Sequence, residues 1–374
     1  MQPKNGMATK EDIEGLFIFI GGFEKWPLLN EDCRREVVKY LDYESRFNLG
    51  ICSKDDHETV EKTKICVEGI GLLENRRLHY QKDNVSVQIR FPNGISIEWI
   101  FSQHEKDTCV QWLPNIPNQD PIVKEVIWKS CGYYEEAVKF AEKWMNKSNF
   151  ELEEIRIEMA KYPSESSQIK LLPCCKEVRI SADDVDQIDW WLRKVPEQLD
   201  LLQLCAYSGN QESLTFPSIF FNAPQILQAS KFNLWRRSVV SDEQLLKLNG
   251  KSMSFDCVVV TDIGINQFIK SWVNGKGVNG FEKFQLWSTG DRDSEVMVAG
   301  LGAEEWDQTF GNEHWAFVKE FKRCYGRGQC YQIKSKVDRF ESLTLSIHED
   351  RLGIYATGKR VENDGEVSTG YRVP

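Results

Sequence analysis

Few residues of this chain stand in a pattern that could carry out chemistry. The sequence has no GxSxG nucleophile elbow, no HExxH zinc motif and no phosphate-binding P-loop. Glycines flank a basic residue at 275–277 and at 326–328, but neither segment has the strand–turn–helix layout that phosphate binding requires. The sequence therefore predicts no nucleotide site at either segment.

Two groups of titratable residues remain as candidate sites. His314 stands next to Glu313, a pairing that suits acid–base catalysis but is also common on protein surfaces. The acids Asp183, Asp184 and Asp186 could ligate a metal, although the glycine and terminal glutamate of a calcium loop are missing. Such acids are also typical of the first turn of a helix. We expect no catalytic residue, metal ligand or cofactor, and so no enzyme.

The 11 cysteines show no metal-binding spacing. No CxxC occurs, Cys174 and Cys175 are adjacent, and Cys324 and Cys330 have no second pair at a fitting distance. The apolar run at residues 16–20 is too short for a signal peptide or a membrane span. We therefore expect reduced thiols in a cytoplasmic or nuclear protein.

The chain is acidic overall, with a formal net charge of −10 over 374 residues. A field of this sign disfavours nucleic acid and anionic membrane as partners. We interpret the strongest basic cluster as a solvated surface; its members are Lys319, Lys322, Arg323 and Arg327.

The N-terminal segment is predicted to form three short helices. Asn30 is a suitable N-cap for the first, and acids follow it at the positive end of the helix dipole. A second helix is predicted over Ser45–Gly50, and a third over 54–62 with Ser53 as its cap. The apolar stripe of the first helix recurs every four residues: Cys33, Val37 and Leu41. So small a unit must pack on a partner or on the rest of the chain.

The order of these residues resembles an F-box. The shared pattern is a leucine–proline pair, a helix with paired acids and aliphatics, the letters YLD, and a leucine before CSK. Here the proline precedes the leucines, and Asp55, Asp56 and His57 stand where the family usually has a tryptophan. The resemblance implies docking into the Skp-type adaptor of a cullin ubiquitin ligase. The implied adaptor-binding residues are Trp26, Pro27, Leu28, Leu29, Val37, Val38, Leu41, Leu49 and Cys52.

Residues 65–121 are expected to form a connecting region that contains a β-hairpin. Ile65–Leu72 is predicted to be a strand, and apolar residues alternate on both sides of Asn93-Gly94. Asn-Gly between alternating runs is a strong hairpin signal. Three prolines between 114 and 121 then indicate a boundary.

From residue 150 onward a short apolar pattern recurs six times. Each copy has apolar residues at relative positions 0, 3 and 5, as in the strands of leucine-rich repeats. The middle residues are Ile155, Val178, Leu202, Phe232, Met253 and Phe284. Helices are predicted over 133–147, 182–195, 241–248 and 262–273. The sequence thus predicts an α/β fold, with an irregular leucine-rich-repeat-like array of strands and helices over 122–330.

Part of this array resembles the F-box-associated type 2 domain of a large nematode family. The resemblance is close over Ser241–Trp287. The matching residues are Leu245, Leu246, Leu248, Asn266, Phe268, Ile269, Lys270, Trp272 and Gly275. An F-box followed by this domain implies the substrate-recognition subunit of a Skp–cullin–F-box ubiquitin ligase.

Residues between the apolar positions of each predicted strand should face the open side of the array. We expect an unknown protein substrate to bind there, with two exposed tryptophans as the strongest contacts. The candidate substrate-binding residues are Arg156, Arg179, Gln203, Asn233, Trp235, Gln285 and Trp287. A competing expectation is that the C-terminal segment covers the tryptophans.

The expected organisation is a loose N-terminus over 1–22, an F-box over 23–64, the connecting region, the array, and a C-terminal β segment and tail over 331–374. Alternating residues up to 358 predict a small antiparallel end sheet, and the last dozen residues are expected to fray. An alternative is a protein-interaction scaffold outside any ligase, in which the N-terminal helices only cap the array.

Overall fold

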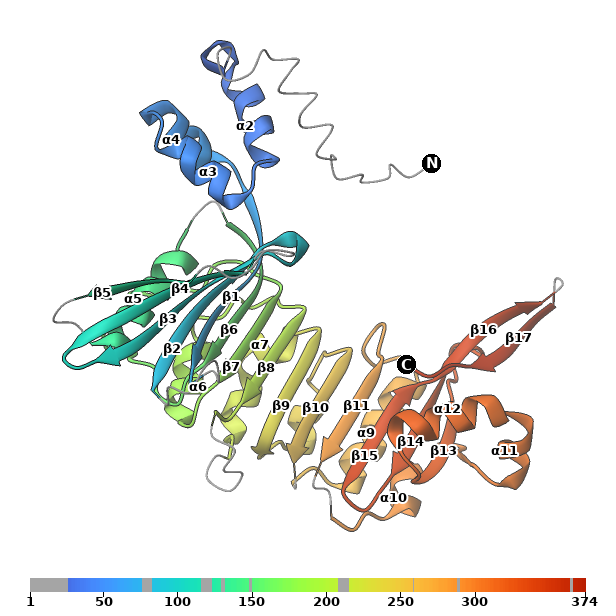
Figure 1. Cartoon of the computed structure of the whole chain (residues 1–374). Helices are drawn as coiled ribbons and strands as arrows, with labels where there is room; N and C mark the ends of the chain where they lie inside the picture. The colour runs from blue at the N-terminus through green and yellow to red at the C-terminus, as the bar shows by residue number, and fades with distance from the viewer. Residues whose placement is uncertain are drawn as a thin grey trace.

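The computed structural model describes residues 26–75, 83–115, 123–128, 132–147, 150–207, 215–257, 259–287, 290–363 and 366–374. The segment 1–22, expected to be loose, lies outside these residues. Three N-terminal helices stand at one end of a long mixed sheet that further helices cover (Figure 1). The chain therefore has the mixed α/β architecture that its sequence predicts.

The N-terminal helices begin at side chains that cap them. Asn30, Asp42 and Ser53 each accept a hydrogen bond from a backbone N–H in the first turn of the following helix. The caps predicted at Asn30 and Ser53 are confirmed, and Asp42, which follows the apolar stripe of the first helix, caps the second. The helices are α2 (Glu31–Lys39), α3 (Tyr43–Gly50) and α4 (Lys54–Lys62).

The first part of the sheet is antiparallel. β2 and β3 form the hairpin predicted around Asn93-Gly94, where Gly94 adopts a positive φ of 74°. Two further strands that the sequence did not reveal extend it to the sheet edge. The elements are β1 (Ile65–Glu74), β2 (Asn84–Arg90), the turn η2 (Pro92–Gly94), β3 (Ser96–His104), β4 (Asp107–Asn115) and β5 (Lys124–Trp128).

The second part of the sheet is parallel and carries one predicted repeat on each strand. The six middle residues form a continuous row, because each pairs with the next across neighbouring strands. All six are buried, so they form the centre of the main core. The strands are β6 (Phe150–Glu158), β7 (Glu177–Ser181), β8 (Leu201–Cys205), β9 (Lys231–Ser238), β10 (Ser252–Cys257) and β11 (Lys283–Trp287).

Helices cover the face of the sheet to which this row points (Figure 1). The helix predicted over 262–273 has those bounds, and Gly275 follows it with a positive φ of 73°, as expected of a residue that ends a helix. The helices are α5 (Tyr133–Met145), α6 (Val185–Leu192), η3 (Ser218–Asn222), α7 (Pro224–Gln228), α8 (Asp242–Leu245), α9 (Asp262–Val273) and α10 (Ser294–Val298).

The C-terminal strands continue the same sheet and do not form a separate end sheet. β15 pairs antiparallel with β11, and β14 and β13 follow outward. The residues expected to fray include β17, which pairs with β16 in a hairpin that projects from the sheet (Figure 1). The remaining elements are α11 (Gln308–Glu313), α12 (Trp315–Tyr325), β12 (Glu304–Glu305), β13 (Gln329–Lys334), β14 (Ser342–Ile347), β15 (Arg351–Ala356), β16 (Gly358–Asn363) and β17 (Glu366–Tyr371).

The main sheet is continuous from β5 to β12 and contains 15 described strands. It passes through both boundaries expected at 121 and 330, because β1 pairs in parallel with β6 and β11 pairs with β15. The connecting region and the tail strands therefore share one sheet with the parallel strands.

Helix α12 lies on the opposite face of the sheet from α5–α10. In β15, Ile354 belongs to the main core, whereas the next residue, Tyr355, contacts Phe321 of α12 with ring centroids 5.2 Å apart. Successive strand residues point to opposite faces, so α12 covers the second face at its β13–β15 end. No described helix covers that face from β6 to β11, and we call this part the open face (Figure 1).

Candidate functional site

The three N-terminal helices have a small core of their own. Trp26, Val38 and Leu49 are buried in it, and the indole N–H of Trp26 donates a hydrogen bond to Asp56 Oδ1 at 2.6 Å. Four half-buried residues pack around them: Leu29, Val37, Leu41 and Val60. The expectation that Trp26, Val38 and Leu49 face an adaptor is corrected here, because their side chains point inward and hold the helical unit together.

Several large apolar side chains of this unit are nevertheless exposed. Of the residues predicted to bind an adaptor, Leu28 is 81% exposed, and Pro27 and Cys52 are also exposed. Three residues that the prediction missed are exposed as well: Tyr40, Phe47 and Ile51. Phe47 and Ile51 stand four residues apart, a helical spacing that was visible in the sequence. We call Leu28, Tyr40, Phe47 and Ile51 the N-terminal apolar surface.

Arg46 fastens the helical unit to the sheet. Its buried guanidinium donates hydrogen bonds to four backbone carbonyls, those of Lys39, Leu41, Thr63 and Lys64. Burial lowers the pKa of Arg46 to about 10, so the group stays charged at neutral pH. Nearby, the ring of Tyr43 stacks on Phe91 and contacts Trp144 of α5. These contacts set how the helices stand on the sheet.

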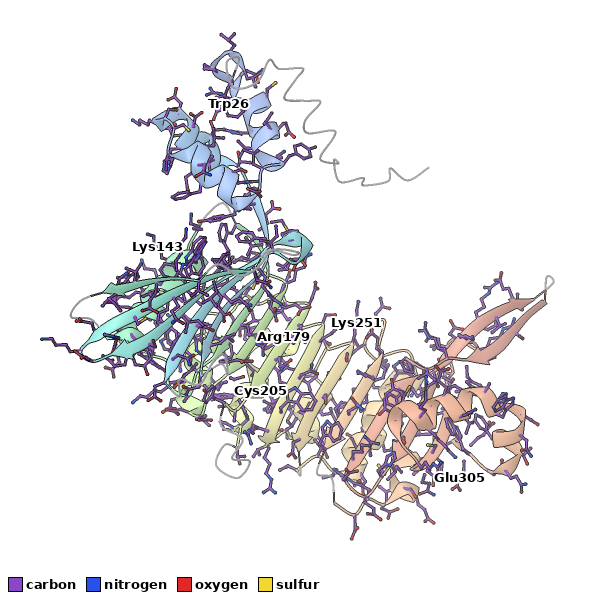
Figure 2. The ribbon with its side chains drawn as sticks, viewed as in Figure 1. Trp26, Lys143, Arg179, Cys205, Lys251 and Glu305 are labelled. Carbon is purple, nitrogen blue, oxygen red and sulfur yellow. The ribbon has the colours of Figure 1, made fainter. Side chains whose placement is uncertain are left out.

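The predicted substrate-binding residues lie on the open face. Five of them form one row across the strands, with Ser254 completing it on β10: Arg156, Arg179, Gln203, Asn233 and Gln285. Arg179 marks this row in Figure 2, and Cys205 marks the next. The arginines are engaged in ion pairs, Arg179 with Glu154 at 2.6 Å and Arg156 with Glu158 at 2.5 Å. Charges at this end of the row therefore offset one another.

The two tryptophans proposed as binding contacts differ in exposure. Trp235 is 51% exposed, whereas Trp287 is half-buried and donates a hydrogen bond from Nε1 to Ser254 Oγ at 3.0 Å. Their ring centroids lie 6.4 Å apart, and the guanidinium carbon of Arg351 lies 5.7 Å from the Trp287 ring. The structure thus brings the two rings together, with Trp235 as the outer one.

The candidate catalytic and metal-binding residues have structural contacts. Asp184 caps α6 by accepting a hydrogen bond from the backbone N–H of Asp186. The ring of His314 packs against those of Phe310 and Tyr371. Within the described ranges, no three His, Cys, Asp or Glu side chains are placed to hold a metal ion. Asp184 therefore has a capping role and His314 a packing role.

A glycine motif that the sequence analysis overlooked is also explained by the fold. Gly275, Gly277 and Gly280 have the spacing GxGxxG. They follow helix α9 and precede strand β11, which is the reverse of the strand-to-helix turn that binds a dinucleotide.

Of the helices in the described part of the chain, none is long and apolar enough to cross a membrane.

The residues that carry the resemblance around α9 have clear structural roles. Asn266 is buried, and its Nδ2 donates hydrogen bonds to the carbonyls of Met297 at 2.8 Å and Ala299 at 3.0 Å. Phe268 and Ile269 pack into the main core. The asparagine therefore joins α9 to the end of α10, and the apolar residues attach α9 to the sheet.

Comparison with known proteins gives the same two regions. Residues 26–68 match the model of the F-box domain, and residues 221–286 match a model described as F-box associated. The chain is 42% identical over 380 aligned positions to an uncharacterized F-box protein of Caenorhabditis elegans, covering 100% of this chain and 98% of that protein. No solved structure matches the chain. The chain therefore belongs to the nematode-type F-box proteins that carry an F-box-associated type 2 domain.

Proposed function

We propose that this chain is the substrate-recognition subunit of a Skp–cullin–F-box ubiquitin ligase in the cytoplasm or nucleus. F-box domains generally bind a Skp-type adaptor, and the ubiquitin transfer itself is performed by other subunits. The chain then acts by holding a protein substrate close to the charged ligase, which raises the effective concentration of its lysines.

The N-terminal apolar surface supports adaptor binding. Leu28, Phe47 and Ile51 are 81%, 58% and 70% exposed on a unit of only three short helices. Several large apolar side chains exposed on so small a unit are typical of a protein–protein interaction surface. Because these helices have their own core, they are also built to act as a separable module and not only as a cap.

The open face is our proposal for substrate binding. Its parallel strands and covering helices suit the role of a leucine-rich-repeat-like receptor, and a row of amide and hydroxyl side chains crosses it. Trp235 is the proposed centre, because large aromatic side chains supply most of the binding energy at protein interfaces. Arg156, Arg179, Gln203, Asn233, Gln285 and Trp287 complete the proposed surface.

Binding of the full chain to a purified Skp-type adaptor tests the proposal. The variant Phe47→Asp should abolish binding, because a charge would be buried against an apolar partner. Ile263→Asp is the matched control, since Ile263 is 60% exposed at the start of α9, far from the N-terminal helices (Figure 1). Equal adaptor affinity of the two folded variants would refute the adaptor role.

The scaffold alternative makes a different prediction. If the helices only cap the array, a chain that lacks residues 23–62 should unfold or aggregate. The separate core of the helical unit leads us to expect that the remaining sheet stays folded, with an unfolding transition close to that of the full chain.

A further inference from the structure

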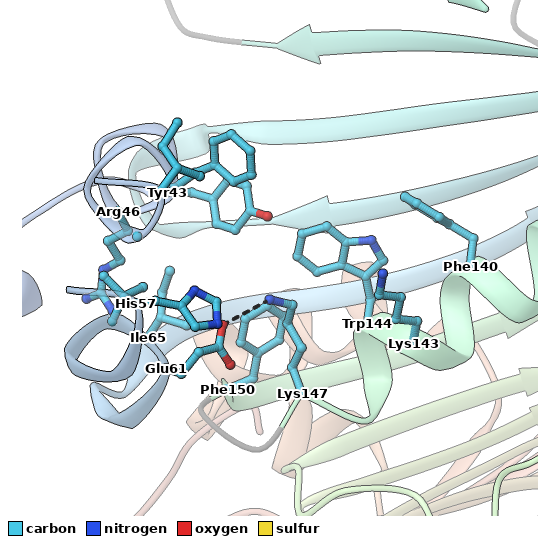
Figure 3. A pocket seen from close by; sticks show the side chains of 14 residues that line it. Tyr43, Arg46, His57, Glu61, Ile65, Phe140, Lys143, Trp144, Lys147 and Phe150 are labelled. Atoms are coloured by element: carbon cyan, nitrogen blue, oxygen red, sulfur yellow. Dashed lines mark ion pairs between the residues drawn. The ribbon is translucent and has the colours of Figure 1, made fainter. Parts of the chain in front are cut away.

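A cavity lies where the N-terminal helices meet the sheet. Its volume is about 310 Å³, and α3, α4, α5 and the starts of β1 and β6 line it (Figure 3). This is at the lower end of the range for pockets that bind small molecules. The cavity lies outside the open face, but Phe47 and Ile51 of the N-terminal apolar surface form part of its lining.

Aromatic rings form much of the wall. Trp144 lies at its centre, with ring centroids 5.4 Å from Tyr43, 5.8 Å from Phe150 and 6.2 Å from Phe140. Trp144 and Phe150 are buried at the edge of the main core, so their positions are fixed by packing. Such a wall fits a flat apolar body that can stack on the rings.

The charged groups around the cavity are mostly positive. Arg46 is buried and bonded only to backbone carbonyls, so no carboxylate among the described residues offsets its charge. Lys147 contacts Glu61 at 3.8 Å, and Lys143 is exposed and makes no ion pair within the described ranges. One acid therefore faces three cations. This imbalance favours an anion.

We propose that this cavity binds a small organic anion with a flat aromatic body, which packs against the partly exposed rings of Tyr43 and Phe140 and places its charge near Lys143. Such a ligand would contact both the N-terminal helices and α5, and so would tie the adaptor-binding module to the sheet. Binding of the ligand does not require that the adaptor or the substrate proposal be correct.

Two fluorescent probes that differ in charge test the idea on the full chain. Anilinonaphthalene sulfonate carries the aromatic body and the anion, and N-phenylnaphthylamine carries the rings without the charge. We expect saturable one-to-one binding of the sulfonate, with the uncharged probe about tenfold weaker. Hydrogen exchange with the sulfonate bound should show protection confined to α3, α4, α5 and the starts of β1 and β6.

Charge reversal on α5 supplies the matched variants. Lys143→Glu should weaken sulfonate binding by about tenfold, because it places a negative charge beside the anion. Lys139→Glu makes the same change on the same helix outside the cavity lining and should leave affinity within about twofold. Both side chains are exposed, so both variants are expected to fold.

Three outcomes would overturn the proposal. These are equal affinity for the two probes, equal affinity of the Lys143→Glu and Lys139→Glu variants, and protection outside α3, α4, α5 and the starts of β1 and β6. Failure of adaptor binding with retained probe binding would instead refute only the ligase role.

Discussion

The indole nitrogen of Trp26 donates a hydrogen bond to the Asp56 carboxylate at 2.6 Å. The two residues are thirty positions apart, one before α2 and the other in the first turn of α4. Asp56 Oδ2 also accepts a hydrogen bond from Ser53 Oγ at 2.7 Å. This group of three residues, of which Trp26 and Asp56 are buried, closes the helical unit.

Trp26→Phe tests that closure. The variant keeps an aromatic ring but leaves Oδ1 of the buried Asp56 carboxylate without its indole donor, which should cost about 1–3 kcal/mol of unfolding free energy. Urea unfolding, followed by helix content, measures the change. Trp315→Phe is the control, because Trp315 is 62% exposed on α12. Identical unfolding midpoints for the two variants would show that the hydrogen bond does not stabilise the unit.

Leu28→Asp and Val38→Asp should separate binding from folding. Leu28 is 81% exposed, so its variant should keep the melting temperature and lose adaptor affinity. Val38 is 0% exposed, so its variant would bury a charge and should unfold the helical unit. Calorimetric melting and adaptor titration of both proteins check this. A stable Val38→Asp protein would contradict the inward orientation of that side chain.

Arg46→Lys should loosen the attachment of the helical unit. A lysine carries the same charge but has only three donors on one nitrogen, so it cannot reach the four carbonyls that the guanidinium bonds. We expect a loss of about 1–3 kcal/mol and faster hydrogen exchange over 39–46 and 63–65. Arg193→Lys, on an exposed side chain, is the control. Unchanged exchange in the Arg46→Lys protein would rule out this role.

The two tryptophans of the open face should respond differently to truncation. Trp235→Ala should change stability by less than about 0.5 kcal/mol, because half of the side chain is already in water. Trp287→Ala should cost roughly 2 kcal/mol, since it removes packing and the hydrogen bond to Ser254. Chemical denaturation gives both values. If substrate binds at the open face, Trp235→Ala should weaken it without this loss of stability.

Cys175 should resist alkylation at mildly alkaline pH, unlike its neighbour Cys174. Burial raises the pKa of Cys175 from 9.0 to about 12, and the reactive species is the thiolate. The unfolded chain releases this proton first as pH rises, so the thiol's contribution to stability is complete below pH 9 and declines towards pH 12. Iodoacetamide labelling at pH 8, read by mass spectrometry, should modify exposed Cys174 and spare Cys175. Equal labelling would contradict the burial.

Local patterns predicted much of the fold correctly. The sequence predicts Asn30 and Ser53 as caps because a capping side chain bonds to a backbone N–H within the next three residues. The row from Ile155 to Phe284 was recognised because each strand repeats the same three apolar positions. Both signals lie within a few residues of chain, where the sequence alone carries the information.

Features that depend on distant partners were not predicted. Val38 lies beside the recognised stripe of α2, but only its contacts with Trp26 and Leu49 show that it points inward. The hydrogen bond that draws Trp287 towards Ser254 joins residues from two strands. Similarly, nothing near Phe321 reveals that α12 packs on the second face of the sheet, against Tyr355.

Only Thr63 and Lys64 separate the end of α4 from β1, and β1 lies inside the sheet between β2 and β6. Arg46 donates hydrogen bonds to the carbonyls of both linking residues, which restricts rotation of the helical unit relative to the sheet. If the proposed ligase role is correct, a substrate bound at the open face would consequently present one side to the ubiquitin-loaded enzyme. The rigid attachment of the helices to the sheet, and not a flexible linker, would then decide which substrate lysines are ubiquitylated.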